Sequence, residues 1–87
     1  MMISGMGRSA LEVGETEHIA VQLVAEQLAT LGYSWREIAT KADIGRTRLA
    51  AIFNGERTIT LEEFVRLCDL ARLDVRDVIS QARGQAH

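Results

Sequence analysis

Apolar residues recur every three or four positions through most of this chain of 87 residues. This spacing places them on one face of a helix. The first stripe predicts a helix over residues 16–31 and is made of Val21, Val24, Leu28 and Leu31. Gly32 is placed to end that helix. Further stripes predict helices over residues 35–42, 46–53, 61–71 and 75–82. The pattern therefore indicates an all-α chain of five helices.

Three of these helices carry a start signal in the sequence. Ser34 with Glu37, and Thr60 with Glu63, have the three-residue spacing of a capping box. Asp74 is placed to cap the last helix. The helix over residues 61–71 is expected to bury Leu61, Phe64, Val65, Leu67 and Cys68. Local start signals that agree with apolar stripes support the all-α prediction.

The helices over residues 35–42 and 46–53 are separated only by Asp43, Ile44 and Gly45. Asp43 and Gly45 tolerate the unusual backbone angles of a sharp turn. Ile44 is the single apolar residue of the joint, so we expect it to fill the angle between the helices. Two helices joined so tightly, with a basic start to the second, predict a helix-turn-helix that presents its second helix to a DNA groove.

The second helix of this unit has an apolar face that must point inward, made of Leu49, Ile52 and Phe53. The opposite face carries short side chains along its middle and arginines near its start. Small residues let a helix approach base edges, and arginine donates two hydrogen bonds to guanine. The candidates for base contacts are Arg46, Thr47, Arg48, Ala50 and Ala51.

A second group of residues is placed to contact the phosphate backbone. Helix N-termini attract phosphate through unpaired N–H groups, and one such terminus begins at Trp35. Polar or basic side chains flank it and also follow the second helix. The candidates for phosphate contacts are Ser34, Trp35, Arg36, Asn54 and Arg57.

These residues resemble the lambda-repressor-like, Cro-type helix-turn-helix domain (XRE family) of phage repressors and small bacterial regulators. The stretch Leu-Ala-Ala-Ile-Phe-Asn-Gly-Glu-Arg at residues 49–57 is especially similar, and the resemblance covers roughly residues 17–82. One departure is Asp43, where the family usually has glycine. The resemblance implies a compact five-helix domain that binds double-stranded DNA, as a homodimer on a two-fold symmetric operator.

The distribution of charge is consistent with that function. The formal net charge of −2 argues against indiscriminate binding to nucleic acid. Residues 35–57 nevertheless hold five basic and three acidic side chains, whereas residues 1–34 hold one basic and four acidic side chains. The positive excess thus falls on the predicted helix-turn-helix, and the acidic remainder would restrict how the protein meets phosphate.

Other function classes find little support in the chain. Cys68 is the single cysteine, which excludes an internal disulfide and is expected to be a small core residue. Glu15, Glu17 and His18 are adjacent but point in different helical directions, so no metal site or other cofactor is expected. No catalytic constellation occurs at a meaningful spacing, and we predict that the protein is not an enzyme. No signal peptide or membrane-spanning run is apparent, which predicts a cytoplasmic protein.

The sequence divides into a mobile N-terminal segment (residues 1–15), a DNA-binding domain (16–83) and a short C-terminal tail (84–87). Without a separate dimerisation domain, the last helix is the best candidate interface. Its apolar residues are Val75, Val78, Ile79 and Ala82, although Val75 and Ile79 could instead complete the monomer core. An N-terminal arm is the alternative interface, through Ile3, Leu11 and Val13.

Two functions compete at this point. The first is a transcriptional regulator, of the repressor type, that binds an operator through residues 46–53. The alternative is an antitoxin-like module that masks a protein partner and regulates its own promoter. An antitoxin would gain from a long tail able to wrap its partner, and only about five residues follow the last predicted helix. The regulator is therefore the favoured prediction.

Overall fold

The computed structural model describes residues 13–86 and contains five helices over that range. Their bounds are α2 Glu15–Thr30, α3 Trp35–Ala42, α4 Arg46–Phe53, α5 Leu61–Ala71 and α6 Val75–Gln85. The all-α prediction is confirmed, and the predicted bounds of α3, α4 and α5 are correct. The predicted arm residues Ile3 and Leu11, and the predicted mobile segment up to residue 12, lie outside the described residues.

Two helices differ from the predicted bounds. α2 starts at Glu15, one residue before the predicted start, and Gly14 is its N-cap. α6 continues three residues beyond Ala82, and the N–H of Ala86 still donates to the carbonyl of Ala82 at 3.0 Å. The predicted end was too early because the apolar stripe stops at Ala82. Periodicity detects only the part of a helix that is buried, and the last turn of α6 is exposed.

The predicted caps are all present. The Ser34 hydroxyl accepts the Glu37 N–H, and Glu37 accepts the Ser34 N–H, which completes the capping box of α3. Thr60 and Glu63 make the same pair of bonds at α5. Asp74 accepts the Arg76 N–H at 2.7 Å at the start of α6. Each cap satisfies amide groups that a helix start leaves unpaired.

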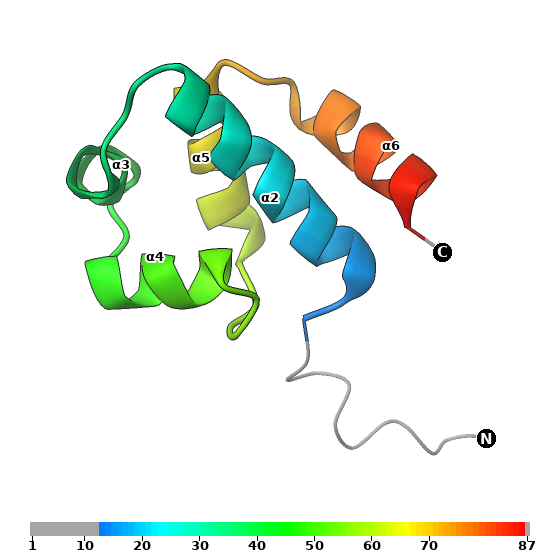
Figure 1. Ribbon diagram of the computed structural model, residues 1–87, viewed down its shortest axis with the longest axis horizontal. Helices are drawn as coiled ribbons and strands as arrows, with labels where there is room; N and C mark the ends of the chain where they lie inside the picture. The colour runs from blue at the N-terminus through cyan, green and yellow to red at the C-terminus, as the bar shows by residue number, and fades with distance from the viewer. Residues whose placement is uncertain (1–12, 87) are drawn as a thin grey trace.

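α2 is the central helix of the fold and lies against α6, α5 and α4 (Figure 1). Three residues of its predicted apolar stripe, Val21, Val24 and Leu28, are buried in the core, whereas Leu31 follows the last residue of the helix and is 39 % exposed. Residues from all five helices and from the turn form that core, and the most deeply buried large side chains are Val24, Leu28, Leu49, Ile52, Leu67, Cys68 and Val78. Burial raises the pKa of the Cys68 thiol to about 11, so Cys68 is the core residue that was predicted rather than a reactive thiolate.

Packing corrects two predictions made from apolar stripes. Leu61 was expected in the core but is 75 % exposed. It is the first residue of α5, and the inward face of that helix begins at Phe64 instead. Val78 and Ala82 were proposed for a dimer interface, yet both are buried in the monomer, at 1 % and 0 % exposure. They complete the core where α6 packs on α2, so they have no surface to offer a partner.

Candidate nucleic-acid interface

The turn between α3 and α4 depends on one left-handed residue. Asp43 has φ 57° and ψ 50°, and it ends α3. The N–H of Ile44 donates to the carbonyl of Ala39 at 3.0 Å, and the Ile44 side chain is buried, as predicted. Gly45, which also tolerates unusual angles, does not use that tolerance, because its φ is an ordinary −59°. The sharp change in direction therefore comes from Asp43, and Gly45 is the N-cap of α4.

α4 presents one face to the core and one to solvent. The predicted inward face is confirmed, since it is buried, and it consists of Leu49, Ile52 and Phe53. The exposed residues of the helix are Arg46, Thr47 and Ala50. Ala51 is half-buried, and its carbonyl accepts the N–H groups of Glu56 and Arg57 at 2.9 and 3.3 Å. The most accessible part of α4 is thus its start and the strip through Ala50.

Arg48 lies on the side of α4 that faces α5, where it forms a two-pronged ion pair with Glu63. Its Nε is 2.7 Å from Glu63 Oε2, and its Nη2 is 2.8 Å from Oε1. Nη2 also donates to the carbonyl of Thr58 at 3.2 Å. The guanidinium, together with the Thr60 cap, lowers the pKa of the Glu63 carboxyl to about 2. Arg48 therefore joins α4 to α5, and its Nε and Nη2 donors are already engaged and cannot make the base contact that was predicted.

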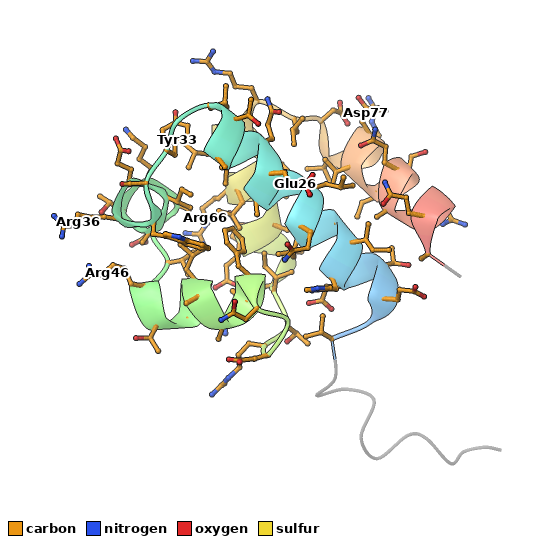
Figure 2. The ribbon with its side chains drawn as sticks, viewed as in Figure 1. Glu26, Tyr33, Arg36, Arg46, Arg66 and Asp77 are labelled. Atoms are coloured by element: carbon orange, nitrogen blue, oxygen red, sulfur yellow. The ribbon has the colours of Figure 1, made fainter. Side chains whose placement is uncertain are left out.

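Arg36 and Arg46 stand at the solvent edge of the helix-turn-helix. Figure 2 shows their side chains extending from α3 and α4 on the same side of the molecule. They border one shallow groove of about 420 Å³, whose remaining lining residues are Ala39, Thr40, Ile44 and Gly45. Two exposed cations beside a groove with small side chains form a surface that suits an anionic backbone.

The start of α3 combines free amide groups with an aromatic side chain. The Ser34 hydroxyl is occupied by the Glu37 N–H, and the Ser34 N–H holds the pKa of Glu37 below its usual value. The amide groups of Trp35 and Arg36 follow at the helix N-terminus. The Trp35 ring packs on Phe53 at a centroid distance of 5.0 Å but remains 56 % exposed. Trp35 thus links α3 to the end of α4 and still offers a face to solvent.

The loop after α4 carries the other two predicted phosphate contacts. Asn54 and Arg57 are both exposed, on the same loop that folds back over Ala51. The sequence prediction missed the residues that hold this loop. For Glu63, the sequence indicated its capping role but not its ion pair with Arg48. Nothing in the spacing of residues revealed that Gln22 contacts Phe53, thirty-one residues away. A polar contact between residues far apart in the chain leaves no periodic trace in the sequence.

The helix-turn-helix family model HTH_3 matches residues 24–78, which include α3, the turn, α4 and α5. The chain belongs to the XRE-type helix-turn-helix family. This membership identifies it as a DNA-binding protein with the lambda-repressor-like all-α fold. A search of curated proteins found no significant match.

A solved structure supports the assignment of the fold. The chain is similar to the clp gene regulator ClgR from C. glutamicum, with a TM-score of 0.69 and 21 % sequence identity. The similarity covers 87 % of this chain and 96 % of the ClgR chain.

Within residues 13–86, no helix of this XRE-type protein is both long and apolar enough to span a membrane.

Proposed function

We propose that this protein is a transcriptional repressor that binds a two-fold symmetric operator, with α4 in the major groove. The observation that carries the proposal is the solvent-facing strip of α4, where Arg46, Thr47 and Ala50 are exposed beside the Arg36 groove. Short side chains allow close approach, and Arg46 supplies a guanine contact. ClgR, which has a similar fold, is described as a gene regulator.

The geometry supports a division of roles among the predicted site residues. Those proposed to read bases are Arg46, Thr47 and Ala50, with Ala51 set behind them. Those proposed to hold phosphates are Ser34, Trp35, Arg36, Asn54 and Arg57. Arg48 has a structural role in this proposal, because Glu63 and Thr58 already occupy its Nε and Nη2 donors. The protein acts by binding, without catalysis or a cofactor.

We expect binding to duplex DNA that weakens as salt rises, because each ionic phosphate contact adds about 0.9 to the slope of log affinity against log salt. Arg46→Ala should cost roughly 1–3 kcal/mol on the preferred site and relax the preference at one base pair. Arg57→Ala should weaken all sequences about equally and reduce the salt slope. Fluorescence anisotropy on a panel of selected duplexes, at several salt concentrations, measures both effects.

Two results would count against these roles. If the wild-type protein binds no duplex from a random pool, or binds with no dependence on salt, the regulator function is wrong. If Arg46→Ala and Arg57→Ala give the same profile across the panel, the division between base and phosphate contacts is wrong.

The proposed dimer uses the part of the apolar surface that the monomer leaves exposed. Val75 and Ile79 on α6 are half-buried rather than buried. Ile79 also borders an apolar groove of about 260 Å³, whose lining includes Ile59, Leu61 and Phe64. The exposed Leu61 is one of the lining residues, and a two-fold interface would bring this same patch of two chains together. Two recognition helices would then read half-sites about 10 base pairs apart.

We expect Leu61→Asp to convert cooperative loading of two chains on one operator into weak binding of single chains. Leu61 is 75 % exposed, and aspartate in the first turn of a helix is favourable, so the fold should be retained. Sedimentation of the protein–DNA complex measures the stoichiometry. Gln81→Asp, an exposed change on α6, controls for the added charge. An undiminished two-to-one complex with Leu61→Asp would place the interface elsewhere.

A further inference from the structure

The loop between α4 and α5 is tied to α2 at both of its ends. Gln22 Nε2 donates a hydrogen bond to the Phe53 carbonyl at 2.7 Å, at the start of the loop. Glu17 Oε2 accepts the N–H of Ile59 at 2.8 Å, near its end. Both side chains come from the N-terminal half of α2, on successive turns of the helix. α2 therefore determines where this loop begins and ends relative to the core.

The loop also packs against α2 at Gly55, near its start. A Cβ on Gly55 would lie 3.0 Å from Cε1 and 3.1 Å from Nδ1 of the His18 ring, and Gly55 has φ +79°. Any other residue would meet the ring and also strain the backbone. His18 Nδ1 is buried and has no hydrogen-bond partner among residues 13–86. The imidazole packs against Gly55, and His18 lies between Glu17 and Gln22 along the sequence of α2.

These three contacts leave the proposed DNA-contacting side chains of the loop free. Asn54 and Arg57 point outward, while the Arg57 N–H is bonded to the carbonyl of Ala51 at 3.3 Å. A loop whose backbone is already ordered loses less conformational entropy when its side chains bind a partner. A loop free to move would lose that entropy on binding and present Arg57 over a range of positions.

We propose that Glu17, His18 and Gln22 form a clamp of positioning residues for DNA binding. They act through the loop, by fixing its backbone so that Asn54 and Arg57 can reach the DNA phosphates beside α4. This inference rests on the proposed DNA-binding role of the loop. It assigns a function to the polar side of α2, a helix that lies outside the helix-turn-helix itself.

Gln22→Ala is the sharpest test, because it removes one clamp bond without changing any charge. We expect operator binding to weaken roughly three- to tenfold, the range for one lost hydrogen bond. The salt slope should fall by up to about 0.9, as for loss of the Arg57 contact. Hydrogen exchange of the Glu56 and Arg57 amides should become faster in the free protein. Gln27→Ala, the same change farther along α2, should alter none of these quantities.

A double-mutant cycle separates positioning from a general loss of stability. In a background that lacks both held side chains (Asn54→Ala with Arg57→Ala), Gln22→Ala should have little further effect on binding, whereas in an Arg46→Ala background it should have its full effect. An equal loss in both backgrounds, or wild-type binding by Gln22→Ala, would overturn the clamp and leave the DNA-binding function standing. Failure of the wild-type protein to bind any duplex would instead refute the proposed function, and the clamp with it.

Discussion

Replacing Ala50 with glutamate should abolish specific DNA binding while leaving the protein folded. Ala50 is exposed at the middle of the solvent face of α4, so the substitution creates no clash within the monomer. Glutamate is a good helix former, and the helix itself should persist. In the proposed complex the longer side chain would hold α4 away from the base edges and would place a carboxylate among phosphates. We expect affinity for the preferred site to fall roughly a hundredfold or more, comparable with an unpaired charge buried at an interface.

Two matched variants control for the added charge and for the size of the side chain. Gln81→Glu adds the same charge to α6, on the other side of α2 from the helix-turn-helix (Figure 1), and should reduce affinity only slightly. Ala50→Ser should keep most of the binding, because serine is small. Anisotropy gives the affinities, and circular dichroism gives the helix content of each variant. Tight, sequence-specific binding by Ala50→Glu would show that α4 does not enter the groove.

The second large effect concerns stability. Arg48→Ala should lower the free energy of unfolding by roughly 2 kcal/mol, because it leaves the Glu63 carboxylate, only 12 % exposed, without its ion-pair partner. The Arg48 side chain is 38 % exposed, so solvent screening keeps the loss below that of a fully buried pair. Urea unfolding at neutral pH measures this loss. If stability is unchanged and only base preference shifts, Arg48 reads DNA as the sequence first suggested.

The same ion pair predicts a dependence of stability on pH. The folded-state pKa of Glu63 is lowered from 4.5 to about 2, so the ionised carboxylate stabilises the fold above the unfolded-state value. This stabilisation should be complete above about pH 5 and should be lost as pH falls from there toward 2, by roughly 2 kcal/mol in all. Glu63→Gln keeps an acceptor for the Thr60 N–H but does not titrate. Its unfolding free energy should therefore fall less over this range than that of the wild-type protein.

Local features of this protein could be predicted from sequence because local interactions produce them. The starts of α3 and α5 follow from capping boxes that span three residues, and Ser34 and Thr60 form them as predicted. The turn requires a residue that tolerates a left-handed backbone, and Asp43 is such a residue. The inward face of α4 follows from helical periodicity alone. Together these features were enough to recognise the helix-turn-helix and its exposed basic start.

The roles of individual surface residues were decided only by the tertiary structure. The sequence grouped Arg48 with Arg46 among the base-contact candidates, and only the position of α5 gives Arg48 Glu63 as a partner. Val78 and Ile79 are adjacent apolar residues, and only the docking of α6 on α2 buries the first and leaves the second part-exposed. Periodicity fixes the directions of side chains around one helix axis, but not which neighbouring helix each direction meets. That depends on how the helices pack, and therefore on contacts between residues far apart in the chain.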